Sequence, residues 1–111
     1  MIDKYERLFR RLLEYVKKAQ DYCEDITFDE FKANSMLMEA CAYNICEIGH
    51  LVRPYVEELQ ALRPDIEWQG WCNLHYWLKS EHGDFLDYYA VWDVIQRSLS
   101  ALQEKLEREM V

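Results

Sequence analysis

Apolar residues recur every three or four positions along most of the chain, which is the spacing of one face of an α-helix. In the first segment this stripe predicts a helix over about residues 2–23, followed by a turn at 24–26. Charged residues occupy the opposite face. The apolar positions of the stripe are Tyr5, Phe9, Leu12, Val16, Ala19 and Cys23.

A capping box predicts where the second helix begins. Thr27 is followed three positions later by Glu30, and each side chain can bond a backbone amide of the other residue. From there a long helix carries an apolar stripe to about residue 52. We expect this helix to be continuous over that stretch.

Proline interrupts the second helix. Gly49 lies inside the stripe, and Pro54 follows it. Because proline removes an intrahelical hydrogen bond and disfavours helical geometry at the preceding Arg53, we expect a kink or break over 52–55. Helical spacing then resumes and ends at the turn 63–65.

The remaining chain predicts a short helix over about 68–80, a connector at 81–83, and a last helix capped by Asp84 or Asp87. Apolar residues of the last helix repeat about every 3.5 positions, which predicts a packing stripe, either internal or between subunits. They are Tyr88, Trp92, Ile95, Leu99, Leu102 and Leu106.

These elements predict an all-α fold, an up-and-down bundle of four to five helices. A chain of 111 residues with three glycines and two prolines fits one domain over residues 1–111. A domain of this size leaves much of its surface uncovered, so dimerisation is a natural expectation.

Charge and cysteine usage limit the classes of function. The net charge of −8 disfavours broad, non-specific nucleic-acid binding but allows a small site with a local positive lining. No signal peptide and no apolar membrane-spanning stretch is visible, so we expect a cytoplasmic protein with no membrane partner. The four cysteines form no CxxC pair, which favours buried thiols over disulfides.

Several short motifs, at their spacings, resemble the HepT-like branch of the HEPN superfamily over about residues 3–108. The likeness begins with an aromatic residue early in the second helix and ends with Val-Trp at the start of the last helix. The motifs are Phe31, Glu47-Ile48-Gly49, Ile66-x-Trp68 and Val91-Trp92.

The resemblance implies a dimeric helical bundle. Many members of the family are ribonuclease toxins held inactive by a nucleotidyltransferase antitoxin. Their motif is an arginine, often followed by asparagine, and a histidine, with four to six residues between the arginine and the histidine. The chemistry uses no metal or other cofactor, because an acid or base acts near the 2′-hydroxyl and a cation stabilises charge on phosphorus.

The sequence departs from this motif. No arginine occurs between Arg63 and Arg97. One alignment places Cys72 at the arginine position with Asn73 after it, and an ungapped alignment places His75 there and Ser80 at the histidine. The family's Ile-Gly-Glu is Ile48-Gly49-His50 here, and no His-x-Tyr follows, since His82 precedes Gly83-Asp84.

Two histidines are the candidate catalytic residues. His75 and His82 can form a rebuilt acid–base pair, because imidazole titrates near neutral pH. Lys79 is the cation of this segment that can contact a phosphate, although it lacks the bidentate geometry of arginine. Asn73 and Tyr76 are further binding candidates, alongside the alternative that all these residues are simply surface positions.

Other interpretations of the segment are open. Cys72, His75 and His82 can be combined as three ligands of an open zinc site, although no second pair has metal-binding spacing. The aromatic residues can stack on bases, but their helical spacing favours the core or a dimer interface. They are Trp68, Trp71, Tyr76 and Trp77. Glu47 and His50 are spaced to form a structural hydrogen bond.

The first hypothesis is a divergent HepT-like protein of a toxin–antitoxin or related system that lacks the ribonuclease motif. It acts as a homodimer on protein partners, and a nucleotidyltransferase-type antitoxin is the partner that the resemblance implies. The alternative is a metal-independent endoribonuclease that cleaves RNA with His75 and His82. A helical dimer with a structural role is a third hypothesis.

Overall fold

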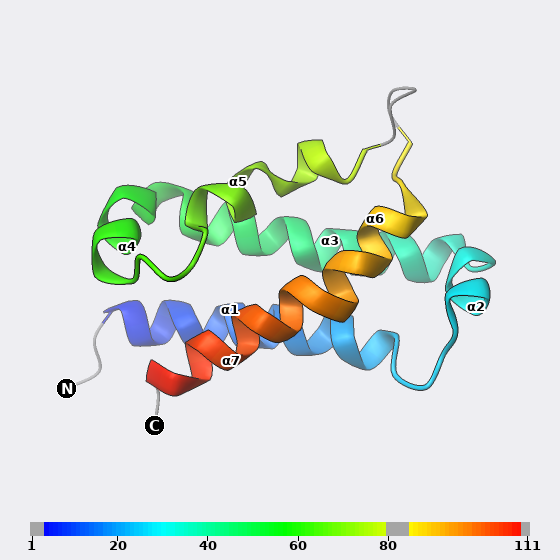
Figure 1. Ribbon diagram of the computed structural model, residues 1–111, viewed down its shortest axis with the longest axis horizontal. Coiled ribbons are helices and arrows are strands. Elements are labelled where there is room, and N and C mark those ends of the chain that lie inside the picture. Colours follow the sequence, from blue (N-terminus) through cyan, green and yellow to red (C-terminus); the bar gives the residue numbers. More distant parts are fainter. Residues whose placement is uncertain (1–3, 80–84, 110–111) are drawn as a thin grey trace.

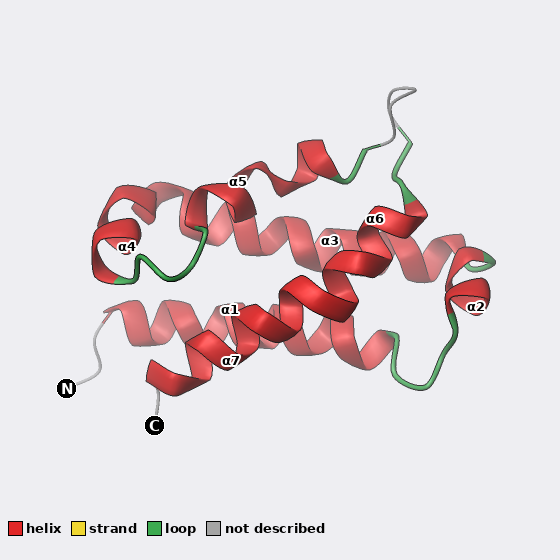
Figure 2. Ribbon diagram, viewed as in Figure 1, coloured by secondary structure: helices red, strands yellow, loops and turns green. Residues whose placement is uncertain are grey.

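The computed structural model describes residues 4–79 and 85–109, and helices make up nearly all of both parts (Figure 2). The all-α expectation is confirmed. The elements are α1 (Lys4–Tyr22), α2 (Phe28–Lys32), α3 (Ser35–Val52), η1 (Arg53–Tyr55), α4 (Val56–Leu62), α5 (Trp68–Trp77), α6 (Tyr88–Asp93), η2 (Val94–Ser98) and α7 (Leu99–Glu109).

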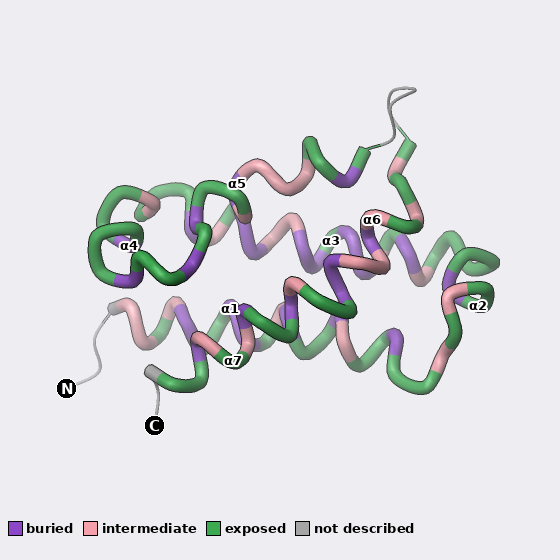
Figure 3. The backbone as a smooth tube through the Cα atoms, viewed as in Figure 1, coloured by how far each residue is buried: buried purple, intermediate pink, exposed green. Residues whose placement is uncertain are grey.

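Helix α3 is the centre of the bundle, with α1 packed along one side and α5 along another. The run α6–η2–α7 crosses in front of α3 and α1: its first part contacts α3 and α2, and its end contacts α1 (Figure 1). Buried positions recur at intervals along the helices, while the outward turns are exposed (Figure 3). Each long helix therefore buries one face against its neighbours, as the apolar stripes predict.

The stripe of the last helix is internal. Ile95, Leu99, Leu102 and Leu106 are all almost fully buried within the single chain. The N-terminal end of the stripe joins an aromatic cluster, in which the ring centroids of Trp92 and Phe31 are 5.1 Å apart. The apolar stripe of the last helix therefore packs within the subunit and not between subunits.

The expectation of one continuous second helix is wrong. The capping box of Thr27 and Glu30 is present and starts α2. This helix ends at Lys32 with Ala33 as its C-cap, and Asn34 starts α3 by accepting a hydrogen bond from the Leu37 amide at 3.1 Å. The asparagine side chain competes with the backbone for helical hydrogen bonds, which permits a second start within a continuous apolar pattern.

The break expected over 52–55 is confirmed. The helix changes to the 3₁₀ turn η1 with Pro54 in its first positions, and α4 continues from Val56. The last helix contains a second irregularity, the π-helical turn η2, which the periodicity did not predict.

The turn after α4 is tied to α7. Arg63 donates to both carboxylate oxygens of Asp65, at 3.0 and 2.9 Å, and to the Lys105 carbonyl at 3.0 Å. Lys105 in turn donates to the Asp65 carbonyl at 2.6 Å. The fully buried Trp68 donates from its indole nitrogen to the Arg63 carbonyl at 3.0 Å. These bonds fix the point at which α5 begins.

Helix α5 crosses α3 at backbone distance, and Gly49 makes this possible. A Cβ atom on Gly49 would lie 2.4 Å from the Trp71 carbonyl oxygen and 3.2 Å from the Cys72 Cα. Both contacts are with backbone, which cannot move aside as a flexible side chain can. The Ile-Gly motif therefore has a structural reason in this chain: it lets α5 lie against α3.

Substituting this glycine tests the crossing. We predict that Gly49→Ala lowers the free energy of unfolding by about 2 kcal/mol, because overpacking outweighs the gain in helix propensity. Gly70→Ala is the matched control, since its Cβ would meet only the Glu67 side chain at 3.6 Å. That variant should gain about 0.5–1 kcal/mol. Urea denaturation measures both, and stabilisation of both variants would contradict the close crossing.

Acid should weaken the turn before α5. The hydrogen bonds from Arg63 hold the pKa of Asp65 below its usual value of 3.8. A carboxyl group whose pKa is lowered by folding stabilises the native state above its unfolded pKa and loses this contribution as pH falls through the folded pKa. We predict that Asp65→Asn lowers stability at pH 7 and has a smaller effect at pH 3. Urea midpoints at the two pH values measure this, and an equal loss at both would contradict it.

Candidate functional site

Helix α5 separates two hollows on the surface of the protein. Its inner face is formed by Trp68 and Cys72, which are buried, and the Cys72 thiol contacts the Gly49 carbonyl at 3.7 Å. Trp68 also stacks on Phe9 of α1, with ring centroids 5.9 Å apart. With this face fixed, the two flanks of α5 are directed to opposite sides.

One flank faces a polar cavity of about 570 Å³ between α5 and the η1–α4 segment. Gln69, Asn73 and Tyr76 line it from α5 because steps of four and three place them on one side of a helix. Gln69 donates to the Asn73 side-chain oxygen at 3.2 Å. The complete lining is Arg53, Pro54, Tyr55, Val56, Glu57, Glu58, Gln69, Cys72, Asn73 and Tyr76.

An arginine that the sequence analysis did not select lies in this cavity. Arg53, at the end of α3, donates from its guanidinium to the Cys72 carbonyl at 3.3 Å. Among the described residues, the Arg53 side chain forms this hydrogen bond and no ion pair with a carboxylate. The signal in the sequence was the break at Pro54, which turns the chain at this residue and presents Arg53 towards α5.

Two carboxylates on α4 add negative charge to the lining of the polar cavity. Glu57 and Glu58 line it from the first turn of α4, and Glu58 accepts a hydrogen bond from the Tyr5 hydroxyl. Burial raises the pKa of the Cys72 thiol, and the neighbouring Arg53 partly opposes this. A buried thiol with a raised pKa is a poor nucleophile, so Cys72 is a structural residue here.

The candidate histidines are not brought together in this cavity. His75 is half-buried on α5 but lines neither hollow, and its ring lies against the adjacent Tyr76 ring at 3.8 Å. His82 lies outside the described residues. The structural pair expected of Glu47 and His50 is present, with 3.1 Å between the carboxylate oxygen and Nδ1.

Lys79 is also separated from the polar cavity. It is exposed just beyond α5, where its backbone pairs with Leu86. Its charge acts on Cys46 of α3: burial and the neighbouring Glu47 raise the pKa of that thiol, and Lys79 lowers it. The cation beside Asn73 and Tyr76 is therefore Arg53, and Lys79 lies towards α3.

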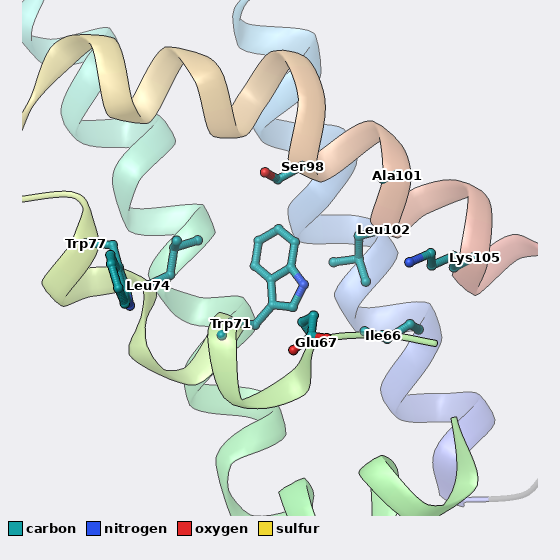
Figure 4. A pocket seen from close by; sticks show the side chains of 10 residues that line it. Ile66, Glu67, Trp71, Leu74, Trp77, Ser98, Ala101, Leu102 and Lys105 are labelled. Carbon is teal, nitrogen blue, oxygen red and sulfur yellow. The ribbon is translucent and has the colours of Figure 1, made fainter. Parts of the chain in front are cut away.

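The other flank of α5 borders an apolar groove of about 390 Å³ against η2 and α7. Figure 4 shows the half-buried Trp71 ring standing between α5 and the last helix, with Trp77 at one end. Trp77 is 73% exposed. The lining is Ile66, Glu67, Gly70, Trp71, Leu74, Trp77, Ser98, Ala101, Leu102 and Lys105.

The aromatic residues thus divide by position. Trp68 belongs to the core, as the helical spacing favoured, and Trp71 partly fills the groove. Tyr76 and Trp77 are 68% and 73% exposed, on opposite flanks of α5. Both rings are therefore accessible at the surface, one beside each hollow.

All four cysteines are free thiols, three of them buried, in agreement with the expectation from their spacing. Within residues 4–79 and 85–109, no three metal-binding side chains are grouped to hold an ion. The zinc interpretation includes His82, which is outside these ranges. No helix in the described part of the chain is long and apolar enough to cross a membrane.

Comparison with known proteins identifies the relatives of this architecture. The family model described as "Ribonuclease HepT-like" matches residues 12–109. A protein of Methanocaldococcus jannaschii, named "Putative RNase MJ0127", is 29% identical over 84 residues, which cover 76% of this chain and 69% of the relative. No solved structure matches.

Substituting an exposed residue beside a cavity should change the free energy of unfolding less than substituting a buried residue of the core. We predict that Tyr76→Ala changes the free energy of unfolding by less than about 0.5 kcal/mol, because the side chain is mostly exposed. Trp68→Phe, which removes the bond to the Arg63 carbonyl, should lower it by about 2 kcal/mol. Urea denaturation measures both, and a large loss in Tyr76→Ala would make this residue structural.

Proposed function

Since the chain belongs to the HepT-like ribonuclease family, we propose that it is a divergent, dimeric partner-binding member of a toxin–antitoxin or related system. In this proposal it lacks the family's ribonuclease activity. Its partner is a nucleotidyltransferase-type antitoxin, and its two copies meet through the flank of α5 that borders the apolar groove.

The separation of the cation from the imidazole carries the proposal. Acid–base cleavage of RNA requires a proton-transferring group within hydrogen-bond distance of the reacting oxygen and a cation beside the same phosphate. The chain has no arginine at 64–96. The guanidinium of Arg53 lies in the polar cavity, and His75 does not line that cavity. This arrangement supports binding over catalysis.

The apolar groove supports association with another protein. It combines half-buried Trp71, exposed Trp77 and aliphatic side chains, the composition found at the centres of protein interfaces. Glu67 and Lys105 also line it and carry opposite charges. In a two-fold dimer the same patch faces itself, so opposite charges within one patch can pair across the contact.

The dimer contact has a direct test. We predict that the protein sediments as a dimer at micromolar concentration and that Trp77→Glu shifts it to monomer, because a buried charge at the centre of the contact is unfavourable. Met36→Glu is the matched control, since Met36 is exposed and does not line the groove. A monomeric wild type, or equal behaviour of the two variants, would overturn the proposed contact.

The absence of catalysis has its own test. We predict that the purified protein does not cleave single-stranded RNA in EDTA, whether dimeric or after Trp77→Glu. Gel analysis of end-labelled RNA measures this. Cleavage that His75→Ala and His82→Ala each abolish would instead establish the endoribonuclease alternative.

The antitoxin partner is tested by co-expression with a nucleotidyltransferase-type protein, where one is encoded next to this chain. We expect the dimer to form a stable complex with it, which Trp77→Glu weakens by separating the two copies and Met36→Glu leaves intact. The lack of a nucleotidyltransferase neighbour, or a neighbour that does not bind, would remove the partner from the proposal.

A further inference from the structure

We propose that Cys23 and Cys41 form a reversible disulfide when a small hydroperoxide reaches Cys23 through the cavity at the end of α1. This oxidation site goes beyond the proposed function, because neither cysteine lines the apolar groove or the polar cavity. The bond ties the end of α1 to the middle of α3, the central helix of the bundle.

The contact between the two thiols is the first observation. The Sγ atoms of Cys23 and Cys41 lie 3.5 Å apart, and the Cys41 Sγ also contacts the Ala19 carbonyl of α1 at 3.9 Å. Cys41 is therefore held in the interface between α1 and α3. A disulfide bond is about 2.05 Å long, so its formation brings the sulfur atoms about 1.5 Å closer together. Cys23 lies just beyond Tyr22, the last residue of α1, so the end of one helix is the part that moves.

A cavity of about 440 Å³ gives one of the two thiols a route to small molecules. It lies between the turn after α1 and the run α6–η2–α7, and Cys23 lines it together with Trp92 and Ile95. Cys23 is 5% exposed, whereas Cys41 is fully buried. Hydrogen peroxide is little larger than water, so it can reach Cys23 but not Cys41. This difference sets the order: Cys23 reacts with the oxidant, and Cys41 closes the disulfide.

The reaction takes place in two steps. The Cys23 thiolate attacks one oxygen of the hydroperoxide, the O–O bond breaks, and Cys23 becomes a sulfenic acid while hydroxide or alkoxide leaves. The Cys41 sulfur then attacks the Cys23 sulfur, the S–O bond breaks, and the departing hydroxide takes up the Cys41 proton as water. In total, two thiols give up two electrons and two protons, and hydrogen peroxide is reduced to two molecules of water.

Burial makes the first step slow at neutral pH. It raises the pKa of the Cys23 thiol, and the hydrogen bond with Cys41 partly opposes this effect. Burial also raises the pKa of Cys41. The thiolate is the nucleophile, and its fraction grows as pH rises towards a raised pKa. Oxidation should therefore be faster at pH 9 than at pH 7, and the pair responds to sustained exposure to oxidant.

The second thiol sets this pair apart from the other two cysteines. Cys46 is less buried than Cys23, and Cys72 is buried as Cys23 is, but within the described residues neither contacts another thiol. A sulfenic acid at Cys23 is captured by a thiol already in contact with it, which is faster than a second encounter with the oxidant. We therefore expect one disulfide within each chain, between Cys23 and Cys41.

The disulfide should stabilise the fold. It closes a ring over residues 23–41, which contains the turn after α1, the whole of α2 and the first part of α3. Such a link restricts the unfolded chain more than the native one. The oxidised protein should unfold at a higher urea concentration than the reduced protein, and dithiothreitol should reverse the shift. A lower or unchanged midpoint would contradict a bond that fits this fold.

The bond is detected in the wild-type chain. The reduced protein is treated with hydrogen peroxide in millimolar excess, and its remaining thiols are blocked with N-ethylmaleimide. Intact mass spectrometry should show the loss of two hydrogens and two blocked thiols out of four. Four blocked thiols after prolonged exposure at pH 9, oxygen addition without a disulfide, or a covalent dimer on a non-reducing gel would each overturn the proposal.

Matched variants assign the partners. Cys41→Ala should lose the disulfide and accumulate a sulfenic acid at Cys23, which dimedone labels, whereas Cys46→Ser should keep the disulfide. Because Cys46 is not fully buried, its variant tests the pairing even if Cys41→Ala does not fold. Loss of the disulfide in Cys46→Ser, or its persistence in Cys41→Ala, would overturn the pairing. Trp77→Glu should form the disulfide at the wild-type rate, which separates this result from that of the dimer contact.

Discussion

The backbone contact between α5 and α3 at Gly49 is the constraint on which the rest of the structure depends. The Trp71 carbonyl occupies the space where any other residue at position 49 would carry a side chain. This approach presses Cys72 and Trp68 into the core and so fixes the rotation of α5 about its own axis. Because a helix turns by about 100° per residue, that rotation decides which side chains enter each hollow.

As a consequence, the two flanks of the short helix α5 differ in chemistry. The polar flank combines amides, a phenol and a guanidinium from another helix, whereas the apolar flank presents two tryptophans beside α7. His75 falls between the flanks, one position before Tyr76. The segment has no arginine at 64–96 and presents one polar and one apolar surface, and the proposal of a binding function rests on these two surfaces.

Local signals were sufficient for most of the fold. The apolar stripes of α1 and the last helix, the capping box at Thr27 and the break at Pro54 all depend on neighbouring residues, and the structure has each of them. Asn34 was missed because the apolar pattern continues on both sides of it, and η2 because a π turn does not interrupt the stripe. Arg53 was missed because its contact with Cys72 spans 19 residues, and no periodicity encodes a contact at that separation.

Native-state hydrogen exchange of α5 tests most directly whether the crossing at Gly49 holds this helix as part of the core. Local opening and global unfolding are distinguished by the free energy at which each amide exchanges. We predict that the amides of Cys72 and Leu74 exchange at the same free energy as the buried amides of α3, in a single cooperative unit. Exchange of α5 through a separate opening of lower free energy, with α3 still protected, would contradict the account.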